Sequence, residues 1–122
     1  MQMVKDTSRG YSIGSYQPDS ITINGQEYSG SLLLMADLLI APWLVSKTDE
    51  LTENHIQSLF SYQPQLVIIG TGSKLKFLNP RLMTLFGQNR VGLEMMTRDA
   101  LCRTYTILMS EGRRILALFL KE

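Results

Sequence analysis

Alternating apolar and polar positions near the start of the chain predict β-structure. Residues 10–16 alternate in this way and fit an edge strand. Residues 21–23 alternate next and are followed by Asn24 and Gly25. This pair is typical of the two-residue turn that joins antiparallel strands, because both turn positions need a positive φ. The chain should then return as an antiparallel strand over residues 26–28.

Two later segments are almost uniformly apolar. Residues 31–43, SLLLMADLLIAPW, and residues 65–70, QLVIIG, show little alternation, which is typical of strands that are covered on both faces. The first segment is interrupted by Asp37 and Pro42, whereas a membrane span needs about 20 continuous apolar residues. We therefore expect buried strands and no transmembrane segment.

Start and stop signals predict three helices. Thr52 is a suitable N-cap for the helix TENHIQSLFS, because its side chain can accept a hydrogen bond from the first helical turn. The helix PRLMTLFG, residues 80–87, begins with proline and should have Gly87 as its C-terminal cap. Thr97 should cap the longest helix, TRDALCRTYTILMSEG, which stops at Gly112.

The order of these elements predicts an α/β fold. Short strands over residues 91–96 and 114–120 complete a βαβαβ unit, which follows the N-terminal β-hairpin region. We expect residues 1–122 to form a single domain with a mixed central sheet. The helices should cover one face of this sheet, and the hairpin should lie over another.

Composition and charge narrow the classes of function. Hydrophobic residues make up 44% of the chain, enough for one core, and 12 Lys and Arg oppose 11 acidic residues to give a net charge of +1. This balance gives no basic field, so no nucleic acid partner is expected. Cys102 is the single cysteine, and the first residues lack the apolar core of a leader, which together predict a cytoplasmic location.

The segment Gly70-Thr71-Gly72 ends a buried strand in the way that many phosphate-binding loops begin. The third glycine of a dinucleotide fingerprint is replaced by Leu75, and no complete Walker loop follows. If the strands that end at Gly70 and Glu94 are parallel neighbours, both of their exits open on one edge of the sheet. Ligands in open α/β sheets bind at that edge.

Two interpretations of this edge remain open. In the first, the glycines serve only a tight turn, and Thr97 only caps its helix. In the second, a small anion binds the backbone N–H groups of the loop and of the first turn after Thr97, and Lys74 and Lys76 add positive charge. Glu94 and Asp99 oppose the second interpretation, because they would repel an anion.

Few side chains in the chain carry chemistry of their own. Cys102 lies beside Arg103, which would favour a thiolate, but its position within a helix next to core residues is typical of a small buried hydrophobe. Tyr105 is the other candidate reactive group. Glu111 opposes the dipole at the end of the long helix and needs a partner such as Arg113. No catalytic or metal-binding motif is complete, and no cofactor is indicated.

Several separated blocks of the sequence resemble a known family. They are Ile23-Asn24-Gly25, Gly30-Ser31, Gly70-Thr71-Gly72, Val91 to Thr97, and Cys102 through Arg113. The family comprises small α/β domains and includes the mitochondrial complex I assembly factor and the adipogenesis-associated Mth-domain protein. The resemblance covers residues 11–120. It implies a three-layer fold, no established enzymatic activity and a role in assembly or interaction, and the short chain looks like a bacterial-type member.

The residues and the resemblance together lead to a first hypothesis of a non-catalytic interaction or assembly-factor-like domain with a protein partner. The alternative is a protein or enzyme that binds a small anionic ligand at the Gly70–Gly72 loop and the start of the Thr97 helix. The candidate contact residues are Gly70, Thr71, Gly72, Lys74, Glu94, Thr97, Arg103, Glu111 and Arg113, and the candidate reactive residues are Cys102 and Tyr105. The sequence does not specify an oligomeric state.

Overall fold

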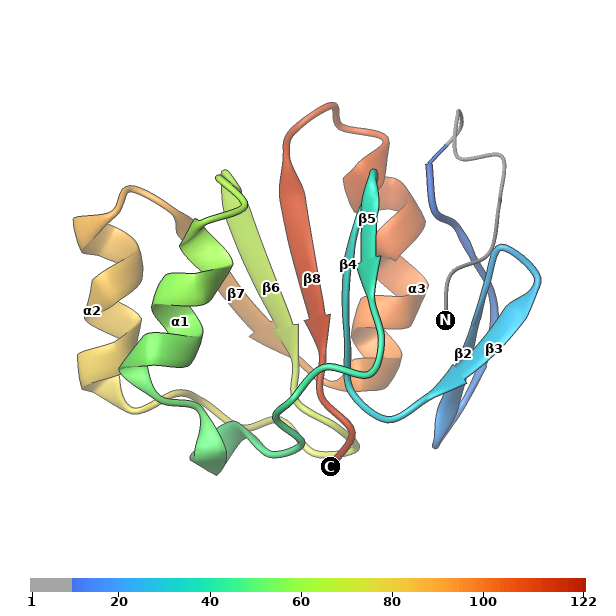
Figure 1. Ribbon diagram of the computed structural model, residues 1–122, viewed down its shortest axis with the longest axis horizontal. Coiled ribbons are helices and arrows are strands. Elements are labelled where there is room, and N and C mark those ends of the chain that lie inside the picture. The colour runs from blue at the N-terminus through green and yellow to red at the C-terminus, as the bar shows by residue number, and fades with distance from the viewer. Residues whose placement is uncertain (1–9) are drawn as a thin grey trace.

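A computed structural model describes residues 10–122, which form two sheets with three α-helices (Figure 1). The elements are β1 (Ile13–Gln17), β2 (Ser20–Ile23), β3 (Gln26–Ser29), β4 (Leu32–Met35), β5 (Leu38–Ile40), a 3-10 turn (Thr48–Glu50), α1 (Glu53–Phe60), β6 (Leu66–Gly70), α2 (Pro80–Gln88), β7 (Gly92–Met96), α3 (Arg98–Met109) and β8 (Ile115–Phe119). The expected domain start and the expected lack of a leader concern residues 1–9, which lie outside the described residues.

The smaller sheet is the predicted hairpin with one additional strand. Its order is β1-β2-β3, and all of its pairs are antiparallel. Asn24 and Gly25 form the turn with φ values of 48° and 83°, as the sequence requires. Ile21 and Ile23 of β2 are buried. The hairpin and the edge position of β1 are therefore confirmed.

The central sheet has the order β5-β4-β8-β6-β7. The three strands β8, β6 and β7 run parallel, whereas β4 is antiparallel to both β5 and β8. All residues of β4, β6 and β8 are buried, which explains their continuous apolar sequences. The apolar run over residues 31–43 contains two strands, of which β4 is covered on both faces and β5 is a half-buried edge strand.

Helices cover both faces of the central sheet, so the expectation of helices on one face was wrong. Figure 1 shows α1 and α2 in front of the sheet and α3 behind it. The cause is the strand order, since the chain crosses from β6 to β7 in one direction and from β7 back past β6 to β8 in the other. Right-handed crossovers in opposite directions place their helices on opposite faces.

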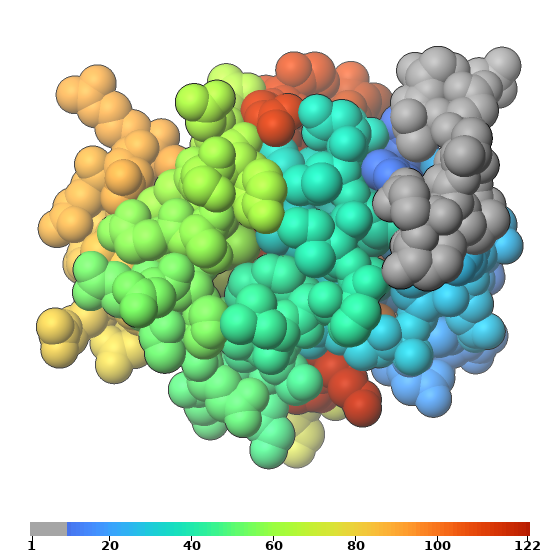
Figure 2. Space-filling view, viewed as in Figure 1, coloured from blue at the N-terminus to red at the C-terminus, as the bar shows by residue number. Residues whose placement is uncertain are grey.

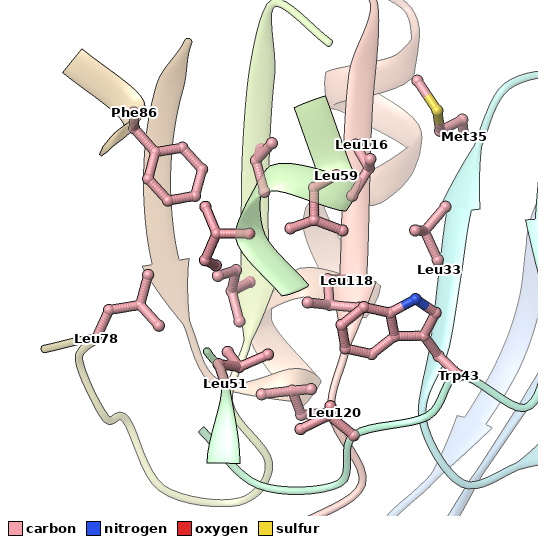
Figure 3. Close-up of a cluster of buried hydrophobic side chains, with 14 residues drawn as sticks. Leu33, Met35, Trp43, Leu51, Leu59, Leu78, Phe86, Leu116, Leu118 and Leu120 are labelled. Carbon is pink, nitrogen blue, oxygen red and sulfur yellow. The ribbon is translucent and has the colours of Figure 1, made fainter. Parts of the chain in front are cut away.

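Each face of the central sheet has its own apolar core. The core between the sheet and α1 and α2 contains 14 buried side chains, which point from both sides into one layer (Figure 3). Phe60 and Phe86 join the two helices at a ring-centroid distance of 5.1 Å. The second core lies between the sheet, α3 and the hairpin sheet, and includes Ile21, Leu101 and Tyr105. The three layers are thus α1 with α2, the central sheet, and α3 with the hairpin sheet.

The predicted helix starts are confirmed, but the predicted ends of α2 and α3 are wrong, and α3 already ends at Met109. The side chains of Thr52, Asn79 and Thr97 each accept a hydrogen bond from the first turn of their helix. Gly87 is not a cap, because α2 continues to Gln88. Arg90 takes the left-handed conformation after this helix, with φ of 59°.

Candidate functional site at the carboxyl edge of the central sheet

The loops that follow β6 and β7 meet at one edge of the sheet. Gly70 at the end of β6 is paired with Met96 at the end of β7 in the parallel register. The Thr71 N–H donates to the Met96 carbonyl oxygen over 2.8 Å, and the Arg98 N–H donates to the Gly72 carbonyl oxygen over 2.8 Å. The expected convergence of these two loops is confirmed.

Glu94 does not lie at this edge, because β7 continues for two residues beyond it. It is exposed within the strand and is paired in register with Ile68. The strand reaches Met96, as expected for residues 91–96, so the expectation that it ends at Glu94 was wrong. Glu94 therefore does not lie next to the glycine loop.

The two glycines of the loop make room for different neighbours. A Cβ at Gly70 would lie 3.1 Å from the Cα of Arg98 and 3.1 Å from a methyl carbon of Leu101, so the first turn of α3 packs directly on the strand. Gly72 has φ of +86°, and a Cβ there would lie 1.5 Å from the carbonyl oxygen of Glu122. The loop therefore needs Gly72 for its conformation and for the close approach of residue 122.

Backbone donors of the loop and of the first turn of α3 have acceptors within the chain. Two of them bind across the loop, as described above. The Ser73 N–H donates to the Glu122 carbonyl oxygen over 3.2 Å, and the Ala100 N–H donates to the Thr97 hydroxyl oxygen over 3.2 Å. An anion at these four donors would have to displace hydrogen bonds that the fold already makes.

The carboxylate of Glu122 neutralises one of the two lysines that were expected to make the loop positive, Lys76. This carboxylate lies 2.7 Å from the Lys76 Nζ and accepts a hydrogen bond from the Thr48 N–H. Burial opposes ionisation of Glu122, but the hydrogen bonds from Lys76 and Thr48 outweigh it and lower its pKa. The same contact raises the pKa of Lys76. Lys74 is exposed, and its carbonyl oxygen accepts from the Thr71 hydroxyl over 2.7 Å.

Three further candidate residues lie along or beyond α3 and do not join one cluster. Arg103 pairs with Asp99 on the exposed side of the helix. Glu111 and Arg113 form an ion pair of 2.8 Å after the helix, which ends at Met109 before the predicted Gly112. They precede β8, whereas the glycine loop faces its end, and the 12 residues of α3 separate the two places by about 18 Å.

The two candidate reactive side chains are buried. Cys102 is 6% exposed, and burial raises the pKa of its thiol to about 11. Burial also raises the pKa of Tyr105, whose hydroxyl donates to the Tyr11 carbonyl oxygen over 3.1 Å. Both groups are therefore neutral near pH 7, which favours packing and hydrogen bonding over nucleophilic chemistry.

Arg98 was missed in the sequence analysis. It is the first residue of α3, and only 5% of it is exposed. Its Nη1 and Nη2 lie 3.4 Å from the carbonyl oxygens of Pro18 and Gly30, and its Nε has no hydrogen-bond partner among the described residues. Burial lowers its pKa. A signal existed, because Arg98 precedes Leu101 and Tyr105 by three and seven positions and so continues their buried stripe.

A cavity of about 470 Å³ lies beside Arg98. Its wall is formed by the β1–β2 turn, the first turn of α3, the loop after β6 and residues 121–122. Two of the candidate residues predicted from the sequence, Gly72 and Cys102, line this cavity. Asp99 also lines it. Within residues 10–122, no group of three or more His, Cys, Asp or Glu residues is arranged to hold a metal ion.

This arrangement of strands, loops and helices is shared with known proteins. Residues 13–120 match the family described as protein of unknown function, DUF498/DUF598. The chain belongs to this family. No helix in the described part of the chain has the length and apolar character of a membrane span.

The similar curated proteins carry one description. The chain is 27% identical over 103 residues to NADH dehydrogenase [ubiquinone] 1 alpha subcomplex assembly factor 3 of Mus musculus, with 83% of this chain and 55% of that protein covered. The protein of the same name from Danio rerio is 24% identical over 113 residues, with 91% and 64% covered. This chain thus spans about half to two thirds of the length of these relatives. The resemblance inferred from the sequence is confirmed.

Solved bacterial structures share the fold. A crystal structure from Bordetella parapertussis has a TM-score of 0.85 at 27% identity and covers 94% of this chain and 98% of its own. An NMR structure from Xanthomonas campestris has a TM-score of 0.84 at 27% identity and covers 96% and 89%. A Bordetella pertussis protein described as a Mth938-like domain has a TM-score of 0.79 at 22% identity, with 99% and 92% covered. The three-layer α/β fold is therefore confirmed.

Proposed function

We propose that this protein is a non-catalytic interaction domain of the assembly-factor type, which acts by binding another protein. The observation that carries the proposal is the extent of the similarity to the mouse assembly factor, which runs through 83% of this chain. A likeness of that extent involves the whole folded domain, whereas a short shared motif would not. The buried and neutral state of Cys102 and Tyr105 also favours binding over catalysis.

The proposed contact surface consists of three exposed apolar side chains at the carboxyl edge of the sheet. Leu44 is 74% exposed on the loop after β5, and Leu75 and Phe77 are 49% and 64% exposed on the loop after β6. Residue 122 links the two loops, because its N–H donates to Ser46 and its carboxylate pairs with Lys76. Figure 1 shows both loops at the lower edge of the molecule, and in Figure 2 the residues that follow β5 form the front of this region. Large apolar side chains that are exposed to water favour a protein interface.

The charges beside these side chains suggest the chemistry of the partner. The loop after β6 reads Lys74, Leu75, Lys76, Phe77, so cationic and apolar residues alternate. Lys74 is exposed, and Lys76 forms an ion pair with Glu122. A partner with an apolar patch and acidic groups around it would match this surface.

Affinity capture followed by mass spectrometry tests the proposal. The bait is the folded wild-type protein, compared with Phe77→Ser and Leu75→Ser. Ile107→Ser is the matched control, because Ile107 is 66% exposed on the outer side of α3. The expected result is a specific partner that the wild type and the control retain and that the two loop variants lose. Recovery of no specific protein, or retention of the partner by every variant, would contradict the proposal.

Gly72→Glu is a poor choice for this experiment, although Gly72 is part of the predicted site. A side chain at that position would collide with the backbone of residue 122, so loss of binding would also follow from local misfolding. The exposed loop residues avoid this ambiguity. The cytoplasmic location stays a prediction for separate measurement.

The alternative function, binding of a small anion, draws no support from the four backbone donors described above, because they already have acceptors. A different part of the molecule favours it. This is the buried guanidinium of Arg98 and the cavity beside it.

A further inference from the structure

Arg98 is a buried cation without an ion-pair partner among the described residues. The ion pairs within residues 10–122 are Lys76–Glu122, Arg103–Asp99, Arg113–Glu111 and Arg114–Asp37. Arginine is almost never fully buried unless it is paired, because removing its charge from water is unfavourable. The position of Arg98 at the start of α3 makes its burial still less favourable, because the helix dipole is positive at that end. Folding alone does not explain why a cation occupies this position.

The guanidinium keeps hydrogen-bond donors for a ligand. It carries five N–H groups, and its two contacts are with the carbonyl oxygens of Pro18 and Gly30 at 3.4 Å, which is long for a charged donor. The Nε–H is buried and has no partner in the described part of the chain. A guanidinium can offer two parallel donors, the geometry that a carboxylate accepts with both oxygens.

The cavity beside Arg98 has the size and lining of a small-molecule site. Its volume of about 470 Å³ lies within the range of about 300–1,000 Å³ found for such sites. Tyr16, Pro18 and Cys102 supply apolar surface around it, and Arg98 is its buried charged group. A mostly apolar wall with one oriented polar group is typical of pockets that bind organic molecules.

The surrounding charges favour a single negative charge on the ligand. Lys121 is a second cation at the cavity. Two acidic residues also line it, but Asp99 is paired with Arg103, and Glu122 is paired with Lys76. Asp19, exposed on the β1–β2 turn, attracts Arg98 without forming an ion pair with it. These carboxylates would repel a doubly charged group such as phosphate more strongly than a singly charged one.

We propose that this cavity binds a small monocarboxylate with an apolar body. The carboxylate accepts hydrogen bonds from Arg98, and the apolar part lies against Tyr16, Pro18 and Cys102. The carboxylate of this ligand would be the ion-pair partner that Arg98 lacks among the described residues. The site is distinct from the apolar loop surface formed by Leu44, Leu75 and Phe77, so it goes beyond the proposed interaction function and can succeed or fail independently of it.

A titration with hexanoate, followed by ¹H–¹⁵N NMR at constant ionic strength, tests the site. Hexanamide has nearly the same shape without the charge, and inorganic phosphate has the charge without the apolar body. Saturable shifts with hexanoate at residues 16–18, 72–73 and 98–102 are expected, with binding of the other two probes weaker by about tenfold or more. No saturable shift with millimolar hexanoate, or equal affinity for hexanamide, would overturn the proposal.

Two arginines provide a matched pair of variants. Arg98→Met keeps the length of the side chain and removes the donors, and exchange of an unpaired buried charge for an apolar group of similar volume preserves folding. It should lose hexanoate binding, while Arg81→Met, at an exposed position of α2 that does not line the cavity, should keep it. Wild-type affinity in Arg98→Met, or equal loss in both variants, would overturn the role of Arg98.

Arg98→Lys provides a second test, because it keeps the positive charge and removes the fork of donors. Its affinity for hexanoate should fall by about tenfold, since lysine cannot hold a carboxylate through two parallel bonds. Wild-type affinity in this variant would overturn the two-bond contact. A spectrum with native dispersion in each variant shows that the loss of binding does not come from unfolding.

Discussion

The two faces of the central sheet are built on the same strands but bury different chemistry. The face under α1 and α2 is filled by aliphatic and aromatic side chains that interlock in one layer (Figure 3). The face under α3 buries Cys102, Tyr105 and the charged Arg98, and it borders a cavity. The first face is explained by packing alone. The second combines packing with polar groups, so we expect substitutions to separate stability from binding between the two faces.

The largest effect should come from truncation on the face under α1 and α2. Leu118 in β8 is fully buried within that core. Leu118→Ala should lower the free energy of unfolding by about 2–5 kcal/mol, because it removes apolar contact and leaves a cavity. Denaturant-induced unfolding measures this loss, with Ile107→Ala as the exposed control. A loss below that of the control would show that this face is not a close-packed core.

The next effect concerns the carboxyl edge, where the two faces meet. Gly72→Ala should lower the free energy of unfolding by about 2–4 kcal/mol, through the positive φ and the collision with residue 122. Gly25→Ala isolates the first cause, since Gly25 has φ of +83° with open space around it, and should lose only about 1 kcal/mol. Equal losses in thermal or denaturant unfolding would mean that residue 122 does not pack on the loop.

A smaller effect is expected from the hydrogen bond within the α3 face. Tyr105→Phe removes the hydroxyl that donates to the Tyr11 carbonyl oxygen and should cost about 1 kcal/mol of unfolding free energy. The substitution leaves the aromatic ring in place, so it separates the polar contribution of this face from its packing. An unchanged unfolding midpoint would indicate that water replaces the lost donor without loss of stability.

The smallest effect concerns the pH dependence of the carboxyl edge. Because the pKa of Glu122 is lower in the folded protein, its ionised form adds stability at neutral pH. This contribution should disappear as the pH falls through the folded pKa, below the ordinary glutamate range. Unfolding of the wild type and of Glu122→Gln, compared from neutral pH to about pH 3, should show a difference that shrinks in acid. A constant difference would contradict the contact with Lys76 and Thr48.

Local signals predicted most of the fold. The Asn24-Gly25 turn, the continuous apolar strands and the caps at Thr52 and Thr97 depend on nearby residues, and the structure contains all of them. The placement of helices on both faces depends on the order of β8, β6 and β7. That order is a property of long-range pairing, and composition and periodicity do not reveal it.

The candidate site was predicted less completely for the same reason. The meeting of the loops after Gly70 and Met96 followed from parallel pairing, but the approach of Glu122 to Gly72 joins residues far apart in sequence. The distance between the two ends of α3 could have been calculated from its length. The burial of Arg98 is consistent with its spacing to Tyr105, but charged residues usually face solvent, so this spacing alone is a weak signal.

The position of β8 has a consequence for how the chain is made. This strand is the last of the described elements, yet it lies between β4 and β6 and contributes to both cores. While the chain is still being synthesised, the pairs β4–β5 and β6–β7 each present an unpaired strand edge. Neither core can close until residues 115–119 have emerged from the ribosome. The growing chain therefore exposes apolar strand edges until β8 is inserted, which favours aggregation of the partly synthesised domain.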